Sequence, residues 1–188
     1  DHNLPFALMI GVRRGVNPAL RVAGDGVGRA DVSVVERLCV ENPDIRFLAT
    51  FLSRENQHEL CVAARKFNNL MPFGCWWFLN NPSIVAEITT ERFELLGTTF
   101  VPQHSDARML EHLIYKWQHS RHIIADCIYS SYEKLLSVGR AVEREEIIRD
   151  VEKLFIGNFS EWVGLTPERI QTHRDPPEPD VVQPGIEF

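Results

Sequence analysis

Four short and almost continuously apolar runs mark the first hundred residues of the chain. They cover residues 5–12, 46–52, 70–76 and 98–102. A short run that is apolar throughout, rather than at every second position, is typical of a strand covered on both faces. The four runs therefore predict parallel β-strands.

Segments with helical spacing lie between these runs. Residues 33–40 and 55–67 each gather apolar side chains on one side. The third segment, residues 82–96, follows Asn81, a good N-cap residue, carries a proline in its first turn and stops at Gly97, a good C-cap residue. This alternation of strand and helix predicts an α/β fold with a parallel sheet.

After the fourth run the pattern becomes helical. Residues 107–117, 121–138 and 143–159 are amphipathic, and Gly139 separates the last two segments. From residue 166 onward the chain is rich in proline and acidic residues, which do not build a core. We therefore expect a globular part over residues 1–165 and an extended tail over residues 166–188.

Two architectures fit four parallel strands with helices. One is a small doubly wound sheet, and the other is one half of a (β/α)8 barrel, which normally takes about 250 residues. Periodicity alone does not choose between them. Both place their ligand sites at the C-terminal ends of the strands, so the residues that directly follow each run are the candidates for chemistry.

Composition excludes some classes of function. The formal net charge is −6 and there is no block of lysine or arginine, which argues against a nucleic-acid partner. No apolar run approaches the ~20 residues of a membrane span. The four cysteines form no C-x-x-C pair and lie in apolar stretches, so we expect them to be buried thiols in a cytoplasmic protein. The chain begins at Asp1 and runs at once into a strand-like segment, as expected of an internal start.

The densest polar cluster, residues 103–108, follows the fourth run. Asp106 can ligate a metal or act as a base, and Arg108 can hold a carboxylate with its planar guanidinium. The alternative is that Ser105 or Asp106 caps a helix that starts near Ala107.

Three further clusters follow the other runs. Arg54 follows the second run, Trp76 and Trp77 end the third, and Arg14 follows the first. The alternatives are a capped helix start for Arg54, buried core for the tryptophans and plain surface for Arg14. The histidines show no H-x-H and no H-E-x-x-H pattern, and His112 lies on a predicted helix.

The sequence around these clusters resembles a known family. The stretches LSRENQHELC at 52–61, MPFGCWWFLNNP at 71–82 and FVPQHSDAR at 100–108 closely resemble the uronate (glucuronate) isomerases of the amidohydrolase superfamily. The resemblance runs from about residue 4 to about residue 164. It implies a metal-dependent (β/α)8 TIM barrel in which the four runs are strands five to eight, so that the chain is the C-terminal half followed by helices.

The resemblance also implies an activity and a set of site residues. The family interconverts D-glucuronate with D-fructuronate and D-galacturonate with D-tagaturonate. Asp106 matches the family's metal ligand and proton carrier. Arg108 and Trp76 match substrate contacts, and Arg14 matches a further one more loosely. Arg54 is a candidate from its position alone.

The same resemblance implies parts that this sequence lacks. The family takes two further ligands for its divalent metal, zinc, from an H-x-H pair in the N-terminal half, and a tyrosine there takes part in proton transfer. Asp106 alone provides a single protein ligand, which is too few for a tight zinc site. We therefore expect an incomplete barrel that is inactive alone and that pairs with an N-terminal half or with a second copy of itself as a homo-oligomer.

This half-barrel interpretation places four side chains on the inner face, namely Phe6, Leu8, Phe47 and Ala49. Two rival functions remain. One is a hydrolase of the same superfamily, although residues 9–11 and 52–54 lack the histidines that it would need. The other is a non-catalytic half-barrel that acts only in assembly.

Overall fold

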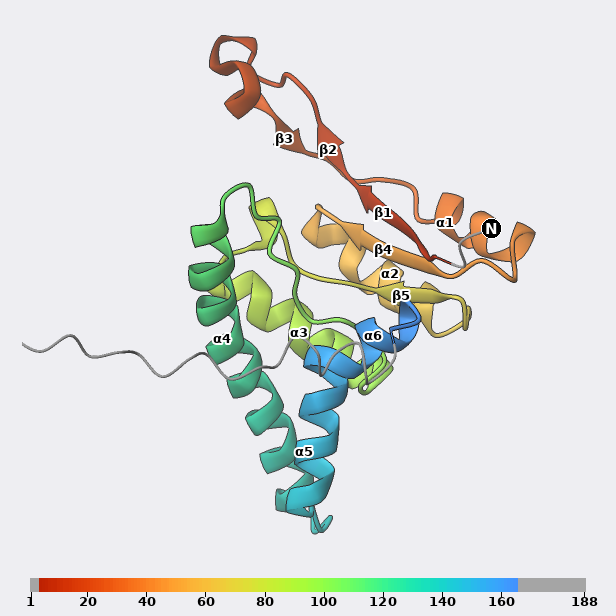
Figure 1. The fold of residues 1–188 in the computed structure, drawn as a ribbon, viewed down its shortest axis with the longest axis vertical. Coiled ribbons are helices and arrows are strands. Elements are labelled where there is room, and N and C mark those ends of the chain that lie inside the picture. The colour runs from red at the N-terminus through yellow and green to blue at the C-terminus, as the bar shows by residue number, and fades with distance from the viewer. Residues whose placement is uncertain (1–3, 166–188) are drawn as a thin grey trace, which may run out of the picture.

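A computed structural model describes residues 4–165 of the chain, and the tail predicted over residues 166–188 lies outside the described residues. Strands and helices alternate and are followed by a group of helices, as Figure 1 shows. The strands are β1 (Phe6–Ile10), β2 (Val12–Arg13), β3 (Gly26–Val27), β4 (Phe47–Phe51) and β5 (Leu70–Pro72). The helices are α1 (Ser33–Glu41), α2 (Gln57–Ala64), α3 (Pro82–Leu96), α4 (Leu110–Ser137), α5 (Arg144–Glu152) and α6 (Asn158–Trp162).

The central sheet confirms the predicted parallel arrangement. Its order is β1-β4-β5, so each strand pairs with the next long strand along the chain. Phe6 lies opposite Phe47, and Phe47 lies opposite Leu70. The C-terminal ends of these strands therefore lie at one edge of the sheet, where the candidate residues were expected.

The fourth predicted strand, residues 98–102, is wrong as a strand. It contributes only an isolated parallel bridge, in which Val101 pairs with Phe73 next to β5. Val101 donates to the carbonyl of Pro72 at 3.0 Å, and Gly74 donates to the carbonyl of Val101 at 2.8 Å. The next carbonyl along the chain that follows β5, that of Gly74, accepts a hydrogen bond from the Arg92 side chain at 3.0 Å. The segment nevertheless occupies the place of a fourth strand.

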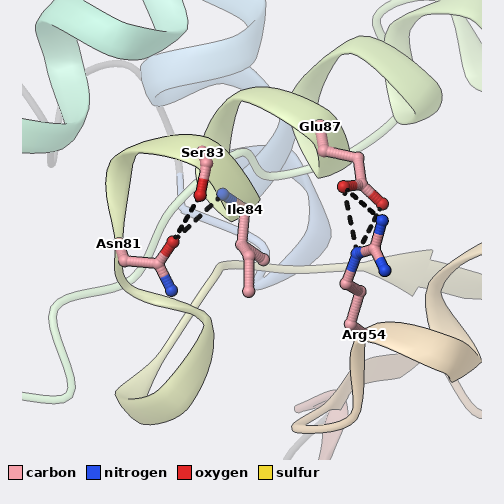
Figure 2. Close-up of polar contacts among 5 residues, drawn as sticks. All are labelled: Arg54, Asn81, Ser83, Ile84 and Glu87. Carbon is pink, nitrogen blue, oxygen red and sulfur yellow. Dashed lines mark hydrogen bonds and ion pairs between the residues drawn. The ribbon is translucent and has the colours of Figure 1, made fainter.

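Helix α3 begins and ends where its sequence signals predict. Figure 2 shows the Asn81 side chain accepting a hydrogen bond from the backbone N–H of Ile84, at 3.2 Å. Ser83 also donates to this side chain, at 3.0 Å. At the other end Gly97 has a φ of 61°. The N-cap and C-cap residues thus fix both ends of the helix.

The two helices predicted over residues 107–117 and 121–138 are in fact one helix, α4, of 28 residues. The polar residues 118–120 do not break it, since none of them is glycine or proline, and the buried Ser120 hydroxyl donates to the carbonyl of Lys116 within the helix, at 2.8 Å. The helix begins at Leu110, after Met109, so a cap by Ser105 or Asp106 is also wrong.

The last predicted helix, residues 143–159, is resolved into three consecutive helical parts. Gly139, with a φ of 86°, separates α4 from α5, as expected. Helix α5 passes through a π-helical turn over Lys153–Gly157 into α6. Figure 1 shows α4 and α5 converging at the end of the molecule away from the hairpin. Among residues 4–165 no helix combines the length and the apolar character needed to cross a membrane.

Two faces of the sheet bury different side chains. Phe47, Ala49 and Phe51 pack against α1 and α2 through Val35, Leu60 and other buried residues. The opposite face is a smaller cluster, which Trp162 of α6 covers in part. It consists of Leu48, Met71, Phe73 and Val101.

Phe47 and Ala49 therefore lie on the face that the helices α1 and α2 cover, and Leu48 lies on the opposite face. The predicted set of inner side chains on β4 is wrong by one residue. Alternate residues of a strand point to opposite faces, so a shift of one residue exchanges the two sets. Strand β1 has no second neighbour among the described strands, and Phe6 is 58% exposed. Over the described residues, one edge of the sheet is thus open.

A small antiparallel hairpin, which the apolar pattern does not predict, follows β1. It consists of β2 and β3, with the 3₁₀ segment Pro18–Gly24 between them. In Figure 1 this hairpin projects beyond the C-terminal end of β1. Gly11 joins it to β1 with a φ of 103° and accepts a hydrogen bond from the N–H of Gly28 at 3.0 Å.

Candidate functional site

A pocket of about 550 Å³ lies beyond the C-terminal ends of the strands. Its walls come from the hairpin after β1, the turn after β5, the segment after Val101 and the first turns of α4. The lining residues are Val22, Ala23, Trp77, Asn80, Asp106, Arg108, His112, Tyr115 and Lys116. We call this cavity the rim pocket. It brings Asp106 and Arg108 together, and it also contains His112, which sequence reasoning left aside as a helix residue.

Asp106 is held in an unusual backbone conformation. Its φ is 43°, in the left-handed region that residues other than glycine seldom adopt. Its carbonyl accepts a hydrogen bond from the Lys116 ammonium at 3.0 Å. Strained backbone of this kind gathers at functional sites, where the surrounding structure maintains it. Asp106 is itself an exposed residue, and it lines the rim pocket.

The two tryptophans occupy different layers. Trp77 lines the rim pocket and stacks on Phe78, with ring centroids 4.7 Å apart. Trp76 is buried, and it lies beside His104 with ring centroids 6.2 Å apart. The structure thus buries Trp76 away from the lining of the rim pocket, and its partly exposed neighbour Trp77 lines it.

His104 belongs to the polar cluster 103–108, but the sequence reasoning gave it no role, and it lies outside the lining of the rim pocket. It lies between Phe73, at a centroid distance of 4.9 Å, and Trp76, and its Nε2 is buried without a hydrogen-bond partner. Burial, together with the nearby positive charges of Arg92 and Lys116, lowers the pKa of His104 to about 4. The imidazole is therefore neutral at physiological pH. Its place two residues before Asp106 was the available signal.

A buried hydrogen-bond network lies under the turn after β5. Arg92 of α3 is fully buried and donates to the carbonyl of Gly74 at 3.0 Å and to the side chain of Gln57 at 3.0 Å. Gln57 in turn donates to the carbonyls of Phe51 and Ser53. These bonds connect the ends of β4 and β5, so the network fixes the base of the site.

Two predicted site residues are engaged outside the rim pocket. Arg14 forms an ion pair with Asp25 within the hairpin. Arg54 forms a forked ion pair with Glu87 of α3, in which Nε and Nη2 each lie 2.9 Å from a carboxylate oxygen, as Figure 2 shows. Neither arginine lines the pocket with Asp106.

The described residues do not complete a metal site. Over residues 4–165 no group of three or more His, Cys, Asp or Glu side chains is placed to hold a metal ion. Asp106 and His112 line the same pocket and have suitable donor atoms, but a catalytic zinc takes three protein ligands. We therefore derive no chemical step through a metal from this chain alone.

The buried imidazole predicts how stability depends on pH. The folded-state pKa of His104 lies below its unfolded value of 6.5, so the unfolded chain binds the proton more tightly. The stability that the neutral, buried imidazole contributes is present above pH 6.5 and is lost as the pH falls toward 4. We expect a loss of about 2 kcal/mol between pH 7 and pH 5, measured by urea unfolding. His104→Gln removes this loss, whereas His122→Gln, at an exposed position on α4, retains it. Equal slopes for the two variants would refute this role of His104.

Comparisons with known proteins agree with the resemblance. The chain is similar to the crystal structure of a uronate isomerase from Bacillus halodurans, with 56% identity and a TM-score of 0.86 over 92% of this chain. A uronate isomerase from Thermotoga maritima, at 15% identity and a TM-score of 0.72, covers 84% of this chain. A glucuronate isomerase from Caulobacter crescentus, at 17% identity and a TM-score of 0.69, covers 82%. These last two show the likeness of fold alone.

The matched region is only part of each relative. The chain spans 41% of the Bacillus halodurans protein, 36% of the Thermotoga maritima protein and 34% of the Caulobacter crescentus protein. No protein-family model matches the chain, and no curated protein matches it. The resemblance inferred from the three sequence stretches is nevertheless confirmed, and the chain is a relative of the uronate isomerases over part of their length.

Proposed function

We propose that the chain is part of a uronate isomerase that interconverts D-glucuronate with D-fructuronate and D-galacturonate with D-tagaturonate. The observation that carries the proposal is the 56% identity to the Bacillus halodurans uronate isomerase over 92% of this chain. The rim pocket supports it, because a carboxylate and two cations lie together beyond the ends of parallel strands.

The reaction sets the requirements of the site. An aldose becomes a ketose when a proton leaves C2 and a proton arrives at C1. At the same time the C2 hydroxyl loses its proton and the C1 carbonyl oxygen gains one. Asp106 is the carboxylate that accepts and returns a proton, and its exposure toward the pocket supports this role. Arg108 binds the carboxylate of the hexuronate. The buried Trp76 packs beside Trp77, which lines the pocket, and Arg14 and Arg54 reach a substrate only after leaving Asp25 and Glu87.

We propose further that β1, β4, β5 and the Val101 segment are strands five to eight of a (β/α)8 barrel. The open edge of β1 and the partial coverage of the relatives support this. The remaining strands come from an N-terminal half or from a second copy of the chain. Only an N-terminal half would also bring the missing ligands of a divalent metal, zinc, because a second copy of this chain lacks the H-x-H pair as well. A bound metal would supply polarisation of the substrate oxygens.

Complementation tests this proposal. The chain is co-expressed with the remaining part of the Bacillus halodurans enzyme, and ketouronate formation is followed by coupled reduction with NADH. We expect no measurable turnover from the chain alone and turnover from the assembled pair. A folded pair that forms but never turns over either D-glucuronate or D-galacturonate would refute the isomerase assignment. Turnover by the chain alone would refute the requirement for a second half.

A non-catalytic role in assembly is the second candidate. The absence of a three-ligand cluster over residues 4–165 favours it for the isolated chain. The same complementation distinguishes the two, because a purely structural half gives an assembled but inactive pair.

A further inference from the structure

A groove of about 920 Å³ runs between α4 and the part of the chain that leads from α5 through the π-helical turn. We call it the helix groove. On α4 its lining residues recur every three or four positions from Trp117 to Leu136, so they form one stripe along the helix. Ile147, Val151 and Phe155 repeat at the same spacing on the opposite wall. The helix groove shares no lining residue with the rim pocket, and the proposed function gives it no role.

The walls of the helix groove are aromatic and apolar. They carry the rings of Trp117, Tyr129, Tyr132 and Phe155. Tyr129 is 65% exposed and Leu136 is 54% exposed, although both line a concave surface. Residues 4–165 therefore leave a contiguous apolar surface in contact with solvent. A surface of this kind is typical of a site that binds a polypeptide segment.

The charged side chains of the helix groove are distributed unevenly. Arg121 lies about one turn after Trp117 on α4, and Glu133 lies about three turns further along the same helix. Glu133 already accepts a hydrogen bond from the Tyr129 hydroxyl at 2.7 Å. The other wall contributes Glu152 of α5. The Trp117 end of the groove thus has a cation beside an aromatic ring and favours an acidic ligand over a basic one.

The tail, residues 166–188, contains a segment of matching chemistry. Its residues 175–180 read DPPEPD, in which Pro176 and Pro179 form a P-x-x-P motif with acidic residues within it and on both sides. Proline-rich motifs of this type favour the polyproline II conformation and dock in grooves that aromatic side chains line. The prolines match the rings of the groove, and the acidic side chains match Arg121.

The length of the tail allows this segment to reach the groove. Figure 1 shows α5 leading away from the end where it converges with α4, toward α6, so the chain leaves α6 on the open side of the helix groove. Pro176 follows Leu165 by eleven residues, which span about 34 Å in polyproline II conformation. The stripe from Trp117 to Leu136 is only about 28 Å long. The motif can therefore reach the Trp117 end of the groove without any rearrangement of residues 4–165.

We propose that residues 175–180 dock in the helix groove of the same chain, with the prolines against the aromatic wall and the acidic side chains toward Arg121. Docking of this segment covers apolar surface that residues 4–165 leave exposed. The inference does not rest on the proposed function, since it involves neither the rim pocket nor an N-terminal half.

A fluorescently labelled peptide of residues 171–188 tests whether the attached tail occupies the groove. The peptide is titrated into the whole 188-residue chain and into the double variant Pro176→Ala, Pro179→Ala. The attached tail competes at an effective concentration on the order of millimolar. We therefore expect the double variant to bind the peptide at least tenfold more tightly than the unaltered chain. The control, Pro167→Ala with Pro184→Ala, removes two prolines outside the motif and is expected to behave as the unaltered chain.

A charge reversal places the binding on the helix groove. Introduced into the Pro176→Ala, Pro179→Ala chain, Arg121→Glu is expected to weaken peptide binding by about tenfold, because an attraction becomes a repulsion. Arg144→Glu makes the same charge change at an exposed position of α5 outside the groove lining, so we expect unchanged binding. Circular dichroism checks that each variant is folded. If Arg121→Glu does not fold, nuclear Overhauser contacts between the proline protons and the Trp117 ring in the unaltered chain locate the tail directly.

Four results would overturn this inference. They are equal peptide binding by the unaltered chain and the proline double variant, no peptide binding by either, undiminished binding by folded Arg121→Glu, and competition that grows with the concentration of the chain. The last result would mean that the tail docks on a neighbouring copy. None of them bears on the isomerase assignment, which the complementation assay decides separately.

Discussion

Asp106→Asn is expected to lower kcat of the complemented isomerase by about 100- to 10,000-fold, the range attributed to a lost general acid or base. The carboxylate is exposed to the rim pocket and has no hydrogen-bond partner among the described residues, so an amide replaces it without breaking a contact of the side chain. The backbone conformation that presents it tolerates asparagine as well as aspartate. NADH-coupled ketouronate formation measures kcat, and thermal melting checks the fold.

Asp44→Asn is the matched control for this substitution. Asp44 is also exposed, but it precedes β4 and so lies toward the N-terminal ends of the strands. The same loss of one negative charge there is expected to leave kcat unchanged. Near-normal turnover by Asp106→Asn would show that another group carries the proton.

Gly74→Ala is expected to lower the free energy of unfolding by about 2–4 kcal/mol, from the combined cost of left-handed backbone and of overpacking. Gly74 has a φ of 71°, and a Cβ atom there would lie 1.9 Å from Cδ2 of His104. His104 has little room to move, because Phe73 and Trp76 flank its ring. Urea unfolding measures the loss.

Gly97→Ala separates the two contributions to this effect. Gly97 also has a positive φ, of 61°, but a Cβ atom there would meet no atom within 4 Å. Gly97→Ala therefore measures only the free-energy cost of placing an alanine in a backbone conformation with positive φ. The double variant Gly74→Ala with His104→Ala removes the clash and is expected to recover part of the lost stability. Equal losses for Gly74→Ala and Gly97→Ala would show that the contact with His104 does not matter.

Local chemistry explains which parts of the fold could be predicted. Strands β1, β4 and β5 lie within apolar runs, and α3 has both of its ends fixed by neighbouring residues, Asn81 and Gly97. The hairpin after β1 has no such pattern, because its short strands are mostly exposed. Helix α4 continues through residues 118–120, whose polar side chains interrupt the apolar spacing but include no glycine or proline to end the helix.

The candidate site was predictable only where its residues follow a strand directly. Asp106 and Arg108 follow the Val101 segment, and they share the rim pocket with Trp77 and Asn80, which follow β5, because parallel segments end at one edge. The choice between Trp76 and Trp77 as the lining residue depends on the backbone of the turn, where Trp77 has a φ of 46°. Lys116 reaches the pocket from a helix wall, so its contribution depends on how α4 packs, which is a tertiary property.

The order of the sheet has a consequence for how the molecule folds. Because each long strand pairs with the next one along the chain, no pairing has to wait for a distant segment, and the entropy lost on closing each βαβ loop stays small. The three strands and their helices can therefore condense in sequence. β1 then presents a row of ordered backbone donors and acceptors at its open edge. An incoming strand meets a preformed template, so its association should be limited by encounter between two folded parts and should depend on their concentration.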